Sequence, residues 1–260
     1  MNIQLTGARA LVTGANSGLG EAIARALADS GADVAVNYVV KPEAAESVAA
    51  DLRAKGRRAF AVQADVSDAQ QVAGMFGRLD QEWGGIDLLV NNAGIDGARA
   101  SGWEADPARW RRVIDINLMG PFLCAREALR RMVAQKRGVI LNMSSVHEVI
   151  AWSGFSAYTA SKAGLGMLTK TLAQEAAPFG VRVVALAPGA IQTPINQDVW
   201  SNPQMLADLQ EKIALGRMGS PEEIARMAVV LLSDAASYVT GTTVFVDGGM
   251  TDYPSFAHGG

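Results

Sequence analysis

The sequence predicts an α/β domain built on a doubly wound parallel β-sheet with helices on both faces. Hydrophobic residues make up 49% of the 260-residue chain and charged residues only 19%, which is enough apolar material for a large covered core. Short apolar runs alternate with longer stretches of helical periodicity along the whole chain. Strands that are apolar along most of their length are buried on both faces, as in a sheet sandwiched between helices.

Seven strands are expected from these runs. Between one strand and the next, a right-handed crossover brings the chain back so that the strands run parallel. The runs are, in order, ALV (10–12), VAV (34–36), AFAV (59–62), IDLLV (86–90), VILN (139–142), VRVVA (181–185) and VFV (244–246). No linker or repeat divides the sequence, so residues 1–260 are expected to form a single domain. The longest interruption, 193–219, follows the carboxyl end of a strand and is a candidate substrate lid.

The charge balance indicates a small-molecule partner. The formal net charge is -3 and no block of like charges is present, so neither nucleic acid nor a membrane surface is an expected partner. No uncharged stretch approaches the roughly 18 residues of a membrane span. The single cysteine, Cys124, excludes an intrachain disulfide and a cysteine-based zinc site, and no metal is expected. A cytoplasmic location fits this cysteine usage.

A glycine-rich turn follows the first predicted strand. Glycines stand at positions 14, 18 and 20, and a helical pattern begins at Glu21. Without a Cβ atom, glycine allows a tight turn and lets a pyrophosphate approach the free N–H groups at the helix N-terminus. An ordinary glycine-rich turn could have the same spacing. A strand before it and a helix after it nevertheless favour dinucleotide binding, so the fold is expected to be of the Rossmann type.

A candidate catalytic group stands in the second half of the chain. Tyr158 and Lys162 are one helical turn apart, and Ser145 precedes them at the end of an apolar run. A phenol ionises near pH 10, and an ammonium group on the same helix face lowers that pKa; a shift of about three units equals roughly 4 kcal/mol. Taken alone, the pair could equally be an exposed i,i+4 contact. With Ser145 it can form a base, the cation that tunes it and an oxyanion partner.

The ordered motifs together resemble the short-chain dehydrogenase/reductase family over the whole chain. They are the glycine turn, Asn91-Asn92-Ala93-Gly94, Asn117, Ser145, Tyr158 with Lys162, and Pro188-Gly189. The resemblance implies an NAD(P)-dependent oxidoreductase, a homotetramer, in which Asn117, Ser145, Tyr158 and Lys162 are catalytic. It implies cofactor contacts from Gly14, Asn16, Ser17, Gly18, Leu19, Gly20, Tyr38, Asp65, Val66, Asn92, Ala93, Gly94, Tyr158, Lys162, Pro188, Gly189, Ile191 and Thr193.

Two of these positions have competing explanations. Asp65 is implied to flank the adenine, yet it could instead cap the helix that follows it. Pro121 lies four residues after Asn117 and has no N–H, so a helix running through both would leave the Asn117 carbonyl free to bind a proton-relay water. Alternatively, the helix could simply start near Pro121.

The choice between NAD and NADP is expected to depend on positions 37–40. A carboxylate there would bind the ribose hydroxyls and repel a 2'-phosphate, whereas an arginine would attract the phosphate. The sequence has neither, and Lys41 is the nearest cation. NAD is therefore the expected cofactor with NADP accepted, and Asn37→Asp is expected to sharpen the preference for NAD.

Three longer segments, 142–148, 188–196 and 247–256, resemble bacterial glucose 1-dehydrogenases within that family. The resemblance implies that Asp96, His147 and Asn196 contact a sugar beside Ser145 and Tyr158, and that the C-terminal tail closes a neighbouring subunit's site. Oxidation of a cyclic aldose at C1 to its lactone is the expected reaction. The match is incomplete, because Asp96 stands where a longer glutamate is usual in that subfamily and Val199 where a lysine is usual.

Two other functions remain open. The first is a short-chain reductase of a ketone, acyl or steroid substrate, with a hydrophobic pocket supplied by Trp152, Phe155 and Trp200. The second is a nucleotide-sensing module that keeps the fold without the chemistry. Such modules usually lose a catalytic group, whereas all four are present in this sequence.

Overall fold

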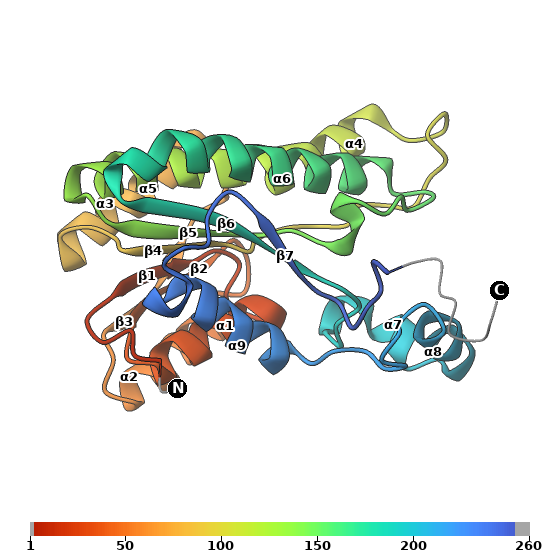
Figure 1. Cartoon of the computed structure of the whole chain (residues 1–260), viewed down its shortest axis with the longest axis horizontal. Helices are drawn as coiled ribbons and strands as arrows, with labels where there is room; N and C mark the ends of the chain where they lie inside the picture. The colour runs from red at the N-terminus through yellow and green to blue at the C-terminus, as the bar shows by residue number, and fades with distance from the viewer. Residues whose placement is uncertain (1–2, 253–260) are drawn as a thin grey trace.

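A seven-stranded parallel sheet forms the centre of the protein, seen in a computed structural model that describes residues 3–252. The strands lie in the order β3-β2-β1-β4-β5-β6-β7, as Figure 1 shows. Their bounds are β1 Arg9–Val12, β2 Asp33–Tyr38, β3 Ala59–Gln63, β4 Leu88–Asn91, β5 Gly138–Met143, β6 Val181–Pro188 and β7 Thr243–Val246. The predicted fold class is confirmed. The strand order reverses beside β1, which pairs with both β2 and β4 and so opens a crevice at the carboxyl ends.

Helices cover both faces of this sheet. In Figure 1, α1, α2 and α9 lie on one face, while α3, α5 and α6 lie on the other. The bounds are α1 Gly18–Asp29, α2 Pro42–Ala54, α3 Ala69–Trp83, α4 Pro107–Ile114, α5 Gly120–Gln135, α6 Ser156–Ala176, α7 Gln197–Trp200, α8 Pro203–Gln210 and α9 Pro221–Leu232. Within 3–252, no helix is both long and apolar enough to span a bilayer.

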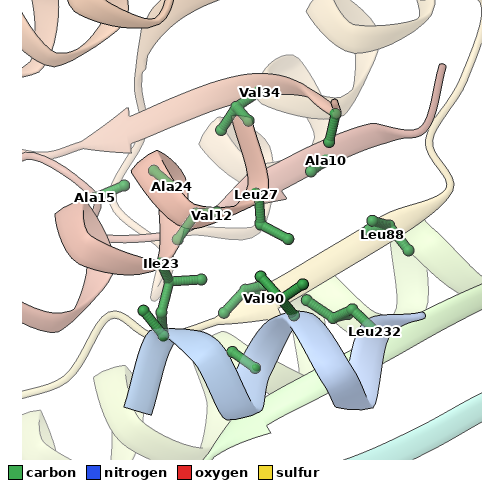
Figure 2. Close-up of a cluster of buried hydrophobic side chains, with 14 of the residues drawn as sticks. Ala10, Val12, Ala15, Ile23, Ala24, Leu27, Val34, Leu88, Val90 and Leu232 are labelled. Carbon is green, nitrogen blue, oxygen red and sulfur yellow. The ribbon is translucent and has the colours of Figure 1, made fainter. Parts of the chain in front are cut away.

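Two buried clusters hold the layers together, one on each face of the sheet. Figure 2 shows the first cluster, in which Ile23 and Leu27 of α1 and Leu232 of α9 gather against Val12 of β1 and Val90 of β4. Burial of side chains of this size contributes roughly 1.5–3 kcal/mol each. The second cluster, beneath α3, α5 and α6, includes Cys124, which is a core residue as expected.

Local sequence signals explain where several helices begin. The Asp68 carboxylate accepts the N–H groups of Gln70 and Gln71 at the start of α3. At α9, Ser220 and Glu223 form a reciprocal capping box ahead of the helix. The fourth strand begins at Leu88, later than predicted. Just before it, the Asp87 carboxylate accepts a hydrogen bond from Nε of Arg9 at 2.7 Å.

The predicted lid, 193–219, carries the short helices α7 and α8 beyond the carboxyl edge of the sheet (Figure 1). Its base is closed by a parallel bridge between Ile191 and Gly219. Near its end, the Leu215 N–H donates to the Gly248 carbonyl at 2.9 Å. The segment is thus tied at both ends to the chain around the crevice, with the two helices between the ties.

Candidate active site

The glycine turn lines a cleft of about 460 Å³ at the carboxyl ends of β1, β2 and β4. Gly14 and Gly18 have φ of +60° and +57°, which favour glycine, and a Cβ at Gly20 would overlap the Gly14 carbonyl. Most predicted cofactor residues line this cleft, namely Gly14, Asn16, Ser17, Gly18, Leu19, Gly20, Asp65, Val66, Asn92, Ala93, Gly94 and Thr193. The crowded glycines and the N-terminus of α1 fit a dinucleotide, whose pyrophosphate these residues would hold.

Thr13 fixes the turn to the next strand, a role that the sequence did not assign. Its hydroxyl accepts the N–H groups of Asn92 and Ala93 at 2.9 and 3.0 Å. The Asn92 amide in return donates to the carbonyls of Thr13 and Gly14. The Asn92 amide therefore shapes the cleft wall as well as lining it.

The prediction that Asn37, at the end of β2, faces the cofactor ribose is wrong. Asn37 is only 1% exposed, its Oδ1 accepts the Gly14 N–H and its Nδ2 donates to the carbonyls of Val62 and Ala64. It cannot face a ribose. Tyr38, predicted to contact the cofactor, packs against the hydrophobic core and is not among the residues lining the cleft. Val39, 43% exposed, lines the cleft instead.

Asp65 is held by Arg112, a cleft residue that the sequence did not single out. The Arg112 guanidinium donates to the Asp65 carboxylate at 2.7 Å and to the Ser67 hydroxyl at 2.6 Å. Burial raises the pKa of Asp65, but hydrogen bonds from the Ser67 hydroxyl, from Arg112 and from the Ser67 N–H outweigh it and keep this pKa below its usual range. Asp68, not Asp65, caps α3. The competing explanation of Asp65 as the helix cap is therefore wrong.

The predicted catalytic residues converge where β5 ends and α6 begins. Ser145 follows β5 and Tyr158 lies in the first turn of α6; both line a second cleft of about 270 Å³. This substrate cleft shares Leu19 and Thr193 with the cofactor cleft, so the two meet. Pro188, Gly189 and Ile191, predicted to contact the cofactor, line its floor.

The electrostatics of this group differ from the sequence expectation. Burial raises the pKa of Tyr158 to about 12, partly opposed by the Ser145 hydroxyl. Burial also lowers the pKa of Lys162 to about 8, opposed by the charges of Asp96 and Glu148. The Lys162 ammonium donates to the Met143 carbonyl at 2.7 Å and lies 5.5 Å from the centroid of the Tyr158 ring. In the protein alone, therefore, Lys162 does not bring the pKa of Tyr158 below its normal value.

Asn117 lies inside a continuous helix. The π-helical turn Asp115–Met119 joins α4 to α5, so the alternative that a helix merely starts near Pro121 is wrong. The Asn117 amide accepts the Ile95 N–H at 2.9 Å, donates to the Ile95 carbonyl at 2.8 Å and contacts the Ser161 hydroxyl at 3.3 Å. Asn117 thereby links the loop after β4 to α6. That its own carbonyl binds a relay water stays a hypothesis.

Aromatic rings form one wall of the substrate cleft. His147 stacks on Trp152 with centroids 4.5 Å apart, and Tyr158 meets both rings edge-on. Burial lowers the pKa of His147, although the Ile150 carbonyl and Asp96 oppose the shift. Burial raises the pKa of Asp96, against the charges of Lys162 and His147. Asp96 and His147 thus line the same cleft as Ser145 and Tyr158, and their contact with a substrate stays a prediction.

Asn196 and Trp200 behave differently from the sequence expectation. The Asn196 carboxamide accepts the Thr193 N–H and hydroxyl and donates to the Ile191 carbonyl. Although it lines the cleft, most of its hydrogen-bonding capacity is used by the base of the lid. The Trp200 indole donates to the Thr193 carbonyl at 3.0 Å and is not among the residues lining the cleft. The tail residues beyond 252, expected to close a neighbour's site, lie outside the described residues.

Glu148 links the segments that carry the candidate catalytic residues. Its carboxylate accepts the Ser144 hydroxyl at 2.6 Å and the Thr243 hydroxyl at 2.9 Å. Gly166 of α6 leaves room for the carboxylate, because a Cβ there would overlap it. Glu148 therefore ties β5, β7 and α6 together, and no motif in the sequence marks this packing.

Comparison with known proteins shows to which family the chain belongs. A family described as "Enoyl-(Acyl carrier protein) reductase" matches residues 14–251. The chain belongs to the short-chain dehydrogenase/reductase family. It is 48% identical over 256 residues to 3beta-hydroxysteroid dehydrogenase 1 of Eggerthella lenta, covering 98% of both chains. This short-chain dehydrogenase/reductase is thus an oxidoreductase of the NAD(P)-using kind.

Further relatives act on varied substrates. The chain is 43% identical to cis-4-hydroxycyclohexanecarboxylate dehydrogenase of Sinomonas cyclohexanicum, covering 93% of the chain and 96% of the relative. It is 41% identical to glucose 1-dehydrogenase 2 of Bacillus subtilis, with coverage of 96% and 97%. A crystal structure of gluconate 5-dehydrogenase from Burkholderia cenocepacia with NADP and tartrate matches with a TM-score of 0.91, at 35% identity and coverage of 96% and 97%.

Proposed function

We propose that the protein is an NAD(P)-dependent dehydrogenase of a hydroxyl group on a saturated six-membered ring. The alcohol loses its hydroxyl proton and a hydride from the same carbon; the products are the ketone, or the lactone at an anomeric carbon, with NAD(P)H and a proton. The observation that carries the proposal is the place of Tyr158 and Ser145 in a cleft that joins the cofactor cleft.

The catalytic roles follow from the same geometry. Tyr158 takes the hydroxyl proton as base and Ser145 donates a hydrogen bond to the developing oxyanion. Because the pKa of Tyr158 is about 12 in the protein alone, ionisation near neutral pH needs nearby positive charge. Lys162, with a pKa of about 8, is mainly protonated at pH 7 and provides such a charge. A bound oxidised nicotinamide supplies the hydride acceptor and a second positive charge. Asn117 holds the loop after β4 against α6 through its hydrogen bonds with Ile95 and Ser161.

An apolar ring alcohol is the first candidate substrate. The cleft wall carries the stacked His147 and Trp152, and the side facing the lid carries Val199 and Leu209. Flat rings and aliphatic side chains suit the body of an alicyclic molecule, while a few polar groups orient it. The 3beta-hydroxysteroid and hydroxycyclohexanecarboxylate dehydrogenases among the relatives are named for substrates of this kind.

Oxidation of a cyclic aldose at C1 is the second candidate. Asp96 and His147 lie within reach of a bound polyol's hydroxyls, and the relative of Bacillus subtilis is named for glucose. The bonding of Asn196 to the lid base leaves only one of its N–H groups for a sugar, which weakens one of the three expected ligands. The aldose reaction is therefore ranked below the apolar ring alcohol.

NAD is proposed as the better cofactor, with NADP accepted. The residues that line the cleft after β2 are Val39 and Val40, which neither attract nor repel a 2'-phosphate. Arg112, also in the cleft, is already paired with Asp65 at 2.7 Å. Among the described residues that line the cleft, no cation is free of a carboxylate partner, so a phosphate gains little.

A homotetramer is proposed as the working assembly. Phe122, Met167 and Phe179 expose large apolar side chains on or next to α5 and α6. A groove of about 400 Å³ between these helices is lined by Phe122, Leu129 and Leu172. Contiguous exposed apolar surface of this kind marks an association site.

Turnover assays test the proposed reaction. Wild type is expected to reduce NAD with cyclohexanol or a hydroxysteroid, and Tyr158→Phe is expected to lose at least about a thousandfold in kcat while the Kd for NADH stays within twofold. Tyr238→Phe, at a fully exposed tyrosine, is the matched control and is expected to behave as wild type. Retained turnover in Tyr158→Phe would contradict the mechanism. Wild type that binds NADH but oxidises no alcohol would indicate a nucleotide-sensing module.

A further inference from the structure

A second cavity, of about 180 Å³, adjoins the substrate cleft at Asp96. We call it the distal cavity; it lies between the loop after β4, the start of α4 and the loop before α6. Arg99, Glu104, Arg109, Trp110 and Phe155 line it. Asp96 lines both cavities, so the distal cavity and the cleft that holds Tyr158 are neighbours at this residue.

The walls of the distal cavity are held by hydrogen bonds between the segments that form it. The Ala100 N–H donates to the Gly154 carbonyl at 3.0 Å, joining the two loops. The Trp110 indole donates to the Ser156 hydroxyl at 3.1 Å, joining α4 to the start of α6. A cavity whose walls are tied in this way is preformed, as ligand sites usually are.

An aromatic surface runs from one cavity to the other. Trp152 lines the substrate cleft and Phe155 lines the distal cavity, and the two rings stack with centroids 3.9 Å apart. Because Trp152 is stacked between His147 and Phe155, an apolar body longer than one ring can lie along the edges of these stacked rings. A single pyranose or cyclohexane ring bound at Tyr158 fills only the first part of this path.

The far end of the path is polar but balanced in charge. Within the described residues, neither Arg99 nor Arg109 has a carboxylate within 4.0 Å, and Glu104 has no cation partner. Asp106, which caps α4 through the Arg109 N–H, adds a second acidic group. The distal cavity is thus lined by two guanidinium groups and, with Asp96 at its near end, three carboxylates. This lining favours a neutral oxygen over an anion, because an anion would also meet the acidic side chains.

We infer that the distal cavity binds the far end of a fused-ring alcohol that carries a second, neutral oxygen remote from the reacting hydroxyl. The inference rests on the proposed ring-alcohol dehydrogenase function and extends it by naming the length and polarity of the substrate. The guanidinium groups of Arg99 and Arg109 donate to that second oxygen. The stacked Trp152 and Phe155 support the rings between the two ends.

Filling the distal cavity tests the inference. The probes are cyclohexanol, a 3-hydroxysteroid with a remote ketone, and the same steroid with a remote carboxylate. In Ala100→Trp, the ratio of kcat/KM for the keto-steroid over cyclohexanol is expected to fall at least tenfold. Ala54→Trp, at an exposed position on α2, is the size-matched control and should leave the ratio unchanged.

Each outcome has a defined meaning. An unchanged ratio in a folded Ala100→Trp overturns the inference, as does a wild type that favours the steroid carboxylate over the keto-steroid. If Ala100→Trp fails to fold, Arg99→Ala is used instead, and a fall in the same ratio of less than twofold overturns the inference. Failure of the proposed function is distinct, because wild type would then oxidise neither cyclohexanol nor either steroid.

Discussion

The end of β2 offers a sharp test of how the cofactor cleft is held, through the substitution Asn37→Asp. The Asn37 amide donates to the carbonyls of Val62 at 3.3 Å and Ala64 at 3.1 Å, and its oxygen accepts the Gly14 N–H at 3.2 Å. Aspartate keeps the acceptor for Gly14 but turns a second oxygen toward two carbonyls. We therefore expect a loss of stability and no gain in NAD preference.

The size of the loss follows from these contacts. Removing a buried donor leaves its acceptors unsatisfied at a cost of about 1–3 kcal/mol, and a buried carboxylate adds a desolvation penalty, for a total of about 2–5 kcal/mol. In a chain of this length about 1 kcal/mol lowers Tm by roughly 2–4 °C, so Tm is expected to fall by about 5–15 °C at pH 7. Because burial raises the pKa of the introduced carboxyl group, the deficit shrinks as pH falls toward its unfolded pKa of about 4.

Thermal unfolding and cofactor kinetics together decide whether the side chain at position 37 stabilises the fold or contacts the cofactor ribose. Val39→Asp is the matched control, because Val39 is exposed and lines the cleft. It is expected to keep Tm within about 2 °C and to raise the NAD-to-NADP ratio of kcat/KM about tenfold, by repelling the 2'-phosphate. If Asn37→Asp instead unfolds like wild type and raises that ratio by itself, its side chain reaches the ribose and our reasoning is wrong.

Two other substitutions test the packing around the catalytic residues. Gly166→Ala puts a methyl group against the Glu148 carboxylate and is expected to lower the free energy of unfolding in urea by about 1–3 kcal/mol. The double variant with Glu148→Ala should lose less stability than the sum of the two single changes. Additive losses would contradict the contact. Lys162→Met tests the buried ammonium. Because the folded pKa of Lys162, about 8, lies below the unfolded value, wild type should gain stability relative to Lys162→Met as pH rises from about 8 to 10.5, and a constant difference would refute this.

Much of the site could be predicted from the sequence because its signals are local or ordered along the chain. The glycine turn between a strand and a helix predicts the cofactor cleft, and the structure lines that cleft with Gly14, Gly18 and Gly20. Tyr158 and Lys162 are brought together by helix periodicity alone. The strand runs likewise fix the sheet, because apolar strands joined by helices have few other ways to bury both faces.

The errors fall where a side chain's direction or bonding partner depends on distant residues. Because β2 is buried on both faces up to Asn37, no alternation of apolar and polar residues marks where the strand leaves the core, and the sequence could not tell that Asn37 is buried and Val39 exposed. The resemblance to glucose 1-dehydrogenases implied that Asn196 contacts the substrate, yet most of its amide's hydrogen bonds go to the base of the lid. The Tyr158–Lys162 spacing pointed to a lowered tyrosine pKa, whereas burial raises it.

The sequence by itself determined the fold class and the family and predicted the catalytic groups, because these follow from periodicity, glycine placement and the order of motifs. Only the tertiary structure decided the environment of those groups. Burial depends on elements far apart in the chain packing together, as when Glu148 meets Thr243 and Gly166. Burial in turn sets the pKa values of Tyr158 and Lys162 and leaves open the cavity beyond Asp96.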